Sequence, residues 1–284
     1  MFNLQHIQGE LGIVTGFQNL HTHTTYCDGE LSPEKMLKAA LDKGLTSVGF
    51  SEHSYVPFDI HYSMDVDQTQ NYINEINALK EKYDGIIEVF LGIEQDYYAQ
   101  FVPEGLDYKI GALHYICVGG EYSSVDAGTS QQQFLVDKLF GGDFYSFAED
   151  YYRVFSNIAK KTNADIIGHF DLVTKYNIDG SFFDEMHPRY LDAALGAMDE
   201  ILKDCNLFEV NTGAMFRLGK TVPYPSPYLL KQLNSRGGEV ILSSDTHDPS
   251  SFGHMFTEML ELLKGCGFKH IKRLTKSGFI NVDI

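Results

Sequence analysis

Residues of the types that bind metals lie close together near the start of the sequence. Two histidines, His21 and His23, lie two positions apart in the segment Asn19–Gly29, and Asp28 follows them directly before a glycine. Because side chains alternate between the two faces of a β-strand, His21 and His23 are expected on the same face. Two imidazoles side by side at a strand end are half of a metal site. Two buried histidines with ordinary hydrogen-bond partners are the alternative.

Residues of the same types recur at regular places along the chain. Short apolar segments alternate with helix-like segments. The short segments predict strands at 46–50, 86–92, 109–113, 164–167, 207–210 and 239–242. A polar residue able to bind a metal or a substrate follows nearly every one of them: His53, Glu94, His114, His169, Asn211, Asp245 and His247. In a parallel β/α barrel the carboxyl ends of all strands share one face, where active sites are built. The pattern therefore predicts an α/β fold of the TIM-barrel type with a metal site on that face.

Helices are predicted between these strands. A Ser-Pro pair indicates a helix from residue 33 to Gly44, and apolar spacing predicts others at about 68–83 and through Tyr152 and Ala159. Residues 115–145 break the alternation, with glycine pairs at 119–120 and 141–142, and are expected to form a long loop. Such a loop after a barrel strand is commonly an active-site lid. A surface excursion without function is the alternative.

The composition excludes other classes of protein. A formal charge of −17 over 284 residues argues against a nucleic-acid surface, which needs clustered Lys and Arg. An apolar run of about 18 residues is absent, so no membrane span is expected, and residues 1–18 show no signal-peptide pattern. The cysteines are scattered, which favours reduced thiols in a cytoplasmic protein: Cys27, Cys117, Cys205 and Cys266. We expect one domain over residues 1–284, with Cys27 as a packing residue or, alternatively, a soft metal ligand.

Taken together, these motifs resemble the polymerase and histidinol phosphatase (PHP) superfamily. They are H-T-H at 21–23 with D-G at 28–29, S-E-H at 51–53, G-I-E at 92–94, L-H at 113–114, G-H-F-D at 168–171 and S-D-T-H at 244–247. The segment 64–94 is most similar to the histidinol-phosphatase branch, and the resemblance covers about residues 17–275. It implies a distorted seven-stranded β/α barrel that holds three divalent metal ions.

The resemblance also implies how the metals are bound. The expected sites are a first metal at His21, His23, Glu94 and Asp245, a second at Glu94, His114 and His169, and a third at Asp28, His53 and His247. Imidazole and carboxylate donors suit Zn, Mn or Fe. Two metals that share a carboxylate can hold a bridging water and lower its pKa, which gives a hydroxide nucleophile at neutral pH.

The expected activity is hydrolysis of a small phosphate monoester. The histidinol-phosphatase branch implies L-histidinol phosphate as substrate, in histidine biosynthesis, with attack by the metal-bridging hydroxide. Three divalent cations leave a net positive pocket that attracts a phosphate and neutralises the developing charge. Asp245, Glu94 and His247 are the expected catalytic residues, and Asp245 is the candidate that passes a proton to the leaving alkoxide.

Arginines are the expected phosphate clamp, because their planar fork matches two oxygens. Arg217 follows the strand end at Asn211 and is the first candidate, while Arg189, near a helix start, is the second; ordinary surface arginines are the alternative. Asn211 is a further substrate-binding candidate. Asp171 either orients His169 or caps the next segment, and Lys175 is expected to be solvated. His6 and His270 are expected at the surface.

Three other functions share part of this pattern. A sibling phosphoesterase that acts on nucleotides or short oligonucleotides would keep every metal ligand, although the acidic charge and the absence of a basic groove disfavour a nucleic-acid substrate. An amidohydrolase-type C–N hydrolase also begins with His-x-His on a first barrel strand, but the additional D-G, S-E-H and S-D-T-H motifs favour phosphoesters. A non-enzymatic metal-binding protein would be expected to lose ligands or arginines. The oligomeric state and the native metal cannot be read from the sequence.

Overall fold

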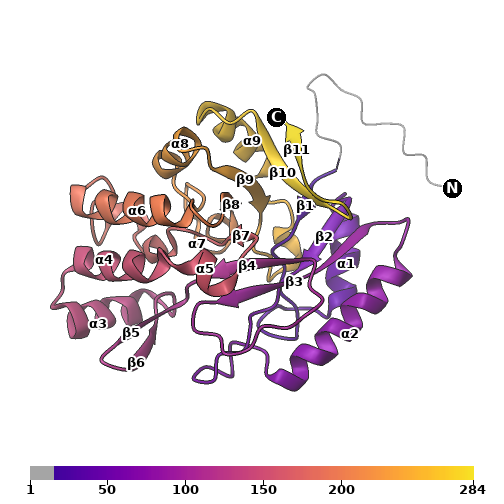
Figure 1. Ribbon diagram of the computed structural model, residues 1–284, viewed down its shortest axis with the longest axis horizontal. Helices are drawn as coiled ribbons and strands as arrows, with labels where there is room; N and C mark the ends of the chain where they lie inside the picture. The colour runs from indigo at the N-terminus through magenta and orange to yellow at the C-terminus, as the bar shows by residue number, and fades with distance from the viewer. Residues whose placement is uncertain (1–15) are drawn as a thin grey trace.

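Seven parallel strands form the central sheet of the computed structural model, which describes residues 16–284 (Figure 1). Their order in the sheet is β1-β2-β3-β4-β7-β8-β9, so that each strand lies beside the next one along the barrel. The strands are β1 (Gln18–Asn19), β2 (Ser47–Phe50), β3 (Glu88–Asp96), β4 (Tyr108–Ala112), β7 (Ile166–Ile167), β8 (Leu207–Asn211) and β9 (Glu239–Ser243). Because all neighbours are parallel, their carboxyl ends point the same way.

The two edges of the sheet meet directly beyond β1 and β9. Thr22 and Thr246 form a parallel bridge, the amide of His23 donates to the carbonyl of Thr246 over 2.8 Å, and the amide of Thr246 donates to the carbonyl of His21 over 2.9 Å. These contacts nearly close the sheet into a barrel. Two of its strands, β1 and β7, are only two residues long, which makes the barrel irregular. The predicted distorted seven-stranded β/α barrel is confirmed.

Helices surround this barrel (Figure 1). They are α1 (Pro33–Asp42), α2 (Val66–Lys82), α3 (Thr129–Phe140), α4 (Phe144–Phe155), α5 (Ile158–Thr162), α6 (Pro188–Ile201), α7 (Gly213–Leu218), α8 (Pro227–Ser235) and α9 (Phe256–Gly265), with 3-10 turns η1 (Leu172–Thr174), η2 (Ile178–Gly180) and η3 (Pro249–Ser251). The helix predicted from residue 33 begins at Pro33, where the fixed φ of proline suits the first helical position. A capping box at Asp65 and Gln68 starts α2 two residues before the predicted position. None of the helices described here is long and apolar enough to cross a membrane.

Most predicted elements differ from the structure by one or two residues at their ends, and two differ more. The strand expected at 86–92 continues to Asp96, because its pairing with β4 extends to Asp96 and Ala112, so Glu94 lies inside β3. The long helix expected through Tyr152 and Ala159 is two helices, α4 and α5. At the junction Asn157 has φ −103° and ψ 9°, outside the helical region.

The prediction that residues 115–145 form a long loop was wrong. They form a hairpin of β5 (Tyr115–Val118) and β6 (Glu121–Ser124), then α3 and the start of α4. The glycines that suggested a loop are turn residues between these elements. Gly119 and Gly120 have φ of 61° and 88°, as a tight hairpin turn requires, and Gly141 ends α3 in the left-handed conformation.

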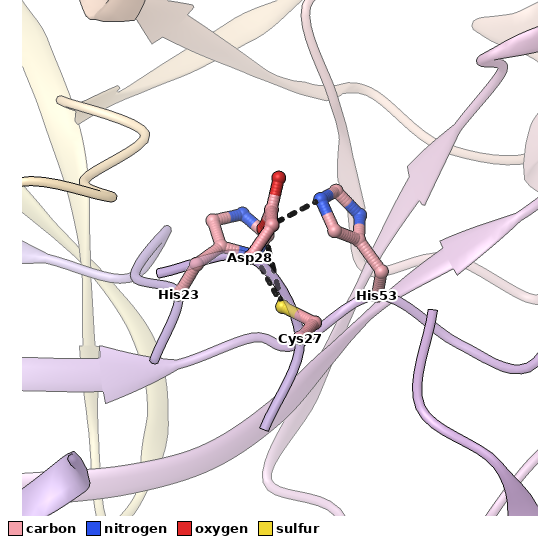
Figure 2. A group of neighbouring side chains, drawn as sticks. All are labelled: His23, Cys27, Asp28 and His53. Carbon is pink, nitrogen blue, oxygen red and sulfur yellow. Dashed lines mark hydrogen bonds and ion pairs between the residues drawn. The ribbon is translucent and has the colours of Figure 1, made fainter. Parts of the chain in front are cut away.

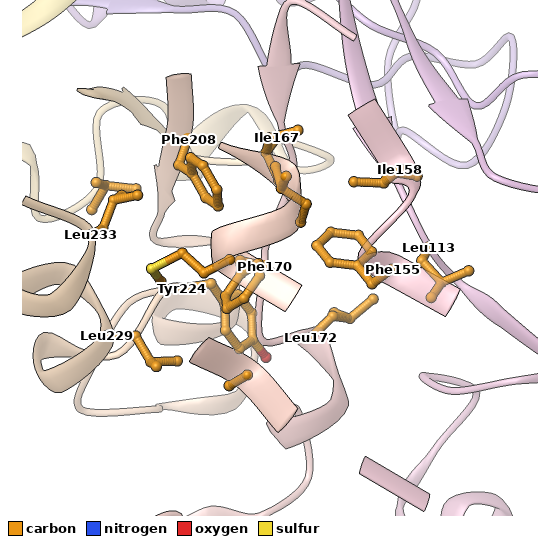
Figure 3. Packing of buried hydrophobic residues seen from close by; sticks show 14 of the residues in the cluster. Leu113, Phe155, Ile158, Ile167, Phe170, Leu172, Phe208, Tyr224, Leu229 and Leu233 are labelled. Carbon is orange, nitrogen blue, oxygen red and sulfur yellow. The ribbon is translucent and has the colours of Figure 1, made fainter. Parts of the chain in front are cut away.

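The hydrophobic core holds the loops that follow the barrel strands (Figure 3). Phe170 is fully buried, with its ring centroid 5.6 Å from that of Phe155 and 5.6 Å from that of Phe208. Leu113 and Leu172 are buried in the same cluster. Each such side chain contributes about 1.5–3 kcal/mol on burial. Because Leu113 and Phe170 directly neighbour His114 and His169, the core fixes the backbone from which these two imidazoles project.

A second hairpin, β10 (His270–Thr275) with β11 (Gly278–Asp283), is tied to the start of the barrel. The side-chain amide of Gln18 donates to the carbonyl of Leu274 over 2.9 Å and accepts from its amide over 2.8 Å. His270, expected at the surface, is partly exposed in β10, whereas His6 lies outside the described residues.

Candidate metal centre

All nine residues predicted to bind metals lie together at the carboxyl ends of the strands. They come from six strand ends: His21, His23 and Asp28 after β1, His53 after β2, Glu94 in β3, His114 after β4, His169 after β7, and Asp245 and His247 after β9. Seven of them are at least 94 % buried, whereas Asp28 and His247 reach the surface of the cavity. The structure therefore places donors from both ends of the chain in one buried cluster.

Glu94 lies at the centre of this cluster. Its Oε2 atom lies 3.3 Å from His21 Nε2 and 2.7 Å from His53 Nδ1. Its Oε1 atom lies 3.3 Å from His114 Nε2 and 2.8 Å from His169 Nε2. His23 Nε2 also lies 3.6 Å from Oε2, so Oε2 faces three imidazoles and Oε1 faces two others. A carboxylate in this position can serve two cations at once.

A second group of donors surrounds Asp28 (Figure 2). Its Oδ1 atom lies 3.4 Å from His53 Nε2 and 3.2 Å from His247 Nε2. The ring of His23 stacks on both of these imidazoles, with centroid distances of 4.2 and 4.1 Å. Figure 2 also shows Cys27 beside Asp28, with its Sγ atom 3.3 Å from Asp28 Oδ1 and 3.4 Å from His23 Nδ1.

This donor set fits divalent metal ions. Two ligand atoms at about 2.0–2.1 Å from a tetrahedral ion lie about 3.3 Å apart, which matches the separations around Glu94 and Asp28. Although they lie close to one another, the Nε2 atoms of His21, His23 and His53 and the Oε2 atom of Glu94 are buried and make no hydrogen bond of acceptable geometry within the described residues. Buried polar atoms without partners are costly unless something binds them. The cluster therefore contains groups that could hold metal ions.

The charges of the cluster also favour cations. Burial would raise the pKa of Glu94, but His21, His114 and His53 hold the pKa well below its usual value, so the carboxylate is ionised. Burial likewise opposes charge on His53, yet Glu94 and Asp28 outweigh it and raise the pKa of this imidazole to about 9. Protons thus occupy positions from which a divalent cation would displace them.

Glu209, in β8, was not among the residues predicted from the sequence, although it fixes His21. Glu209 Oε2 lies 2.8 Å from His21 Nδ1 and accepts from Ser243 Oγ over 2.6 Å. Its Oε1 atom accepts from the His169 amide over 2.6 Å and from Asn211 Nδ2 over 2.8 Å. Partners of this kind orient a metal-binding imidazole. The signal in the sequence is a charged residue in the middle of an apolar strand.

Two other acidic residues, also absent from the sequence prediction, support the histidines. Asp96 lies two residues beyond Glu94 in β3, and its Oδ2 atom lies 3.2 Å from His114 Nδ1. Glu52 is fully buried and accepts from the Cys27 thiol and from the amide of Thr24. Cys27 thus connects Glu52 to His23. The alternation of side chains along β3 was the available signal for Asp96.

Arg217 reaches the cluster from α7. It donates to the carbonyl of Asp245 over 2.6 Å and to Asp245 Oδ2 over 2.8 Å, and its Nη1 atom lies 3.0 Å from His247 Nδ1. Asp245 itself has φ 46°, a left-handed conformation that is uncommon for non-glycine residues. This conformation lets both its carbonyl and its side chain face the guanidinium.

The other two predicted substrate-binding residues are placed differently. Arg189 lies on α6 and pairs with Asp143 and Glu149 at distances of 2.8 and 2.7 Å, so the structure does not bring it to the cluster. A helix start in the sequence does not indicate which way its side chains point. Asn211 is fully buried with its side-chain groups bound to Glu209, Asp245 and the amide of Gly213. It therefore holds Glu209 and Asp245 in place through these hydrogen bonds.

Asp171 does not contact His169, because its side chain accepts from the amide of Ser226 over 2.9 Å. It makes no capping bond to η1 either. Burial, with some contribution from Glu185, raises the pKa of Asp171 to about 7. Neither predicted role of Asp171 is therefore seen.

A cavity of about 220 Å³ opens onto the cluster. Besides metal-binding residues and Arg217, its walls contain Tyr62, Asp126, Leu172 and Lys175. Lys175, expected to be solvated, instead pairs with Asp126 over 2.8 Å and is only 15 % exposed. The prediction for Lys175 was wrong, because the hairpin and α3 bring Asp126 against it.

The chain is similar to several known proteins. The PHP domain model matches residues 19–213. A probable histidinol-phosphatase of Deinococcus radiodurans is 30 % identical over 276 residues, which cover 91 % of this chain and 99 % of that protein. The histidinol-phosphatase of Bacillus subtilis is 24 % identical, with 85 % and 97 % of the two chains covered.

A solved structure shares the fold. The histidinol phosphate phosphatase of Lactococcus lactis, in complex with Zn, L-histidinol and phosphate, superposes with a TM-score of 0.64 at 23 % identity, over 93 % of this chain and 98 % of that one. The family model covers well over half of the present chain, and the Deinococcus relative is similar over nearly all of it. The chain therefore belongs to the PHP domain family, and it is a metal-dependent phosphoesterase of that family.

Proposed function

We propose that the protein hydrolyses L-histidinol phosphate to L-histidinol and phosphate, a step of histidine biosynthesis. The observation that carries this proposal is the buried cluster of nine donors centred on Glu94, with Arg217 at its edge. The names of the relatives from Deinococcus and Bacillus support the substrate, as do the molecules bound to the Lactococcus enzyme.

The size of the cavity supports a small substrate. Pockets for drug-sized ligands measure about 300–1,000 Å³. The cavity above the cluster measures about 220 Å³, which suits a metabolite better than an oligonucleotide. The net charge of −17 further disfavours a nucleic-acid substrate.

Three divalent ions, Zn, Mn or Fe, are the proposed cofactors. The proposed ligand sets remain His21, His23, Glu94 and Asp245 for the first ion, Glu94, His114 and His169 for the second, and Asp28, His53 and His247 for the third. When bound, such ions act as Lewis acids that lower the pKa of water and neutralise charge on the phosphoryl oxygens.

The residues of the chain have separate tasks in this reaction. Arg217 is proposed to bind a phosphoryl oxygen, since a guanidinium has five N–H donors and those to Asp245 and His247 leave some free. Burial would raise the pKa of Asp245, but Arg217 and His21 hold it well below its usual value. The carboxylate is thus ionised and available to a cation. The proposed role of Asp245 in passing a proton to the leaving oxygen rests on its position at the cavity and not on its pKa. Glu209, Asp96 and Asn211 hold these groups in place.

A substrate panel tests the proposal. Phosphate release should be measured with L-histidinol phosphate, p-nitrophenyl phosphate, a nucleoside monophosphate and a sugar phosphate. The kcat/KM for L-histidinol phosphate is expected to exceed the others by about 100-fold or more, which corresponds to about 2.7 kcal/mol. Equal or higher values for a nucleotide or sugar phosphate would assign the protein to a different phosphoesterase activity.

A further inference from the structure

One carboxylate in the cavity wall is outside the set of proposed metal ligands. The described residues that line the cavity include four carboxylates, of which Asp28, Glu94 and Asp245 belong to the metal cluster. The fourth is Asp126, in the loop between β6 and α3. It comes from the segment that follows β4 and interrupts the regular alternation of strands and helices. Asp126 is therefore the carboxylate available to the organic part of a substrate.

The position of Asp126 is well fixed. Its Oδ1 atom accepts from Ser124 Oγ over 2.9 Å, and its Oδ2 atom accepts from Lys175 Nζ over 2.8 Å. The hydroxyl of Tyr176 donates to its carbonyl. The Asp126 side chain is only 16 % exposed. An ionised carboxylate has about four lone-pair sites, so these two side-chain bonds leave room for a further donor.

The carboxylate is also charged. Burial would raise the pKa of Asp126, but Lys175 and His114 outweigh burial and hold the pKa below its usual range. A fixed anion in a small cavity is a specific partner for a cation on the ligand. The same cavity contains Arg217 and the metal cluster, which suit the opposite charge. The cavity thus has a region for a phosphate and, at Asp126, a carboxylate that an ammonium group would share with Lys175.

We propose that Asp126 binds the ammonium group of an amino-alcohol phosphate and so sets the specificity of the enzyme. This inference rests on the proposed function, because L-histidinol phosphate has an ammonium group on the carbon next to that of its ester oxygen. With the phosphoryl group at the metal cluster and Arg217, the ammonium group is oriented by Asp126. Phosphates of similar size without this group lack the contact.

Two substrates that differ only in the amine measure this contact. The first is L-histidinol phosphate and the second is 3-(imidazol-4-yl)propyl phosphate, which lacks the ammonium group. The wild-type ratio of their kcat/KM values is expected to be about 10–100 in favour of the amine, as for a charge-assisted hydrogen bond. In Asp126→Asn this ratio should fall to within about threefold of one. If Asp126 only anchors Lys175 and Tyr176, both substrates lose efficiency equally, the ratio is unchanged, and the inference is overturned.

A second variant is expected to act in the opposite direction. Lys175→Met removes the positive partner of Asp126 and leaves its carboxylate more attractive to an ammonium group. Inhibition by L-histidinol, which contains no phosphate, should therefore become several-fold stronger in Lys175→Met and weaker in Asp126→Asn. A poorly folded variant cannot bind L-histidinol more tightly, so a gain in affinity supports the proposal. Weaker inhibition in Lys175→Met would contradict it.

The outcomes separate this inference from the proposed function. If the protein hydrolyses L-histidinol phosphate but Asp126→Asn leaves the ratio of the two kcat/KM values unchanged, the proposed function stands and the role of Asp126 is refuted. Failure of the wild-type protein to hydrolyse L-histidinol phosphate would remove both. Inorganic phosphate serves as the matched inhibitor, because its inhibition constant should change less in Asp126→Asn than that of L-histidinol.

Discussion

Glu209→Gln is a sharp test of how the metal centre is held. The carboxylate of Glu209 receives four hydrogen bonds, two at each oxygen. A glutamine has the same shape but only one oxygen, so two of the four donors must face an amide NH₂ group. If that group faces His21 Nδ1, the imidazole proton moves to Nε2. His21 Nε2 is the atom directed at Glu94, and a protonated Nε2 cannot bind a metal.

The size of the effect follows from these contacts. Each hydrogen bond to a charged group contributes about 1.5–3 kcal/mol, so two lost bonds correspond to about 3–6 kcal/mol before relaxation. Rotation of the Ser243 hydroxyl and the change of tautomer in His21 recover part of this loss. We expect metal affinity to fall by about 10–100-fold, the range for partners of metal-binding histidines. This corresponds to about 1.4–2.7 kcal/mol.

Competition with a chromogenic chelator measures this affinity, and mass spectrometry measures the remaining metal. Ser243→Ala is the matched control, because it removes one donor to Glu209 but leaves the bond to His21. Its metal affinity should stay within about threefold of the wild type. Unchanged metal affinity and activity in Glu209→Gln would refute the reasoning, as would a Ser243→Ala variant that is equally damaged.

Two further predictions concern the metals and the phosphate. The purified protein should contain close to three divalent ions per chain by mass spectrometry. Chelation should lower its melting temperature, because each site contributes about 2.7 kcal/mol to stability when free metal exceeds Kd by 100-fold. A fully loaded protein with one ion or none would contradict the trinuclear proposal. Arg217→Ala should lower kcat/KM by about 100-fold and weaken inhibition by phosphate, as for loss of a donor to developing charge. Its metal content should persist because Asn211 still holds Asp245, and full catalytic efficiency in this variant would place the clamp elsewhere.

The barrel and the convergence of its donors could be predicted because they follow from local pattern. When strands are parallel, the residues that follow them lie on one shared face of the sheet. On this face His21 Nε2 lies 3.6 Å from Asp245 Oδ1. A charge inside the apolar strand β8 marks Glu209 as unusual, but its contact with His21 depends on how two distant strands face each other, which the sequence does not give locally. The position of Asp126 depends on how a hairpin and α3 fold back against Lys175, and this packing has no local signature.

The contact that closes the barrel also sets the order in which the protein matures on the ribosome. Thr22 and Thr246 join strands from opposite ends of the chain, and the metal-binding residues His23 and Asp245 are 222 positions apart (245 minus 23). At about 5–20 residues per second, synthesis of this interval takes about 10–45 seconds. During that time the nascent chain carries His21 and His23 without the carboxylate that completes their site. Loading of the proposed first metal site is therefore expected to be late, and a chain that ends before Asp245 lacks both the contact that closes the barrel and the carboxylate of that site.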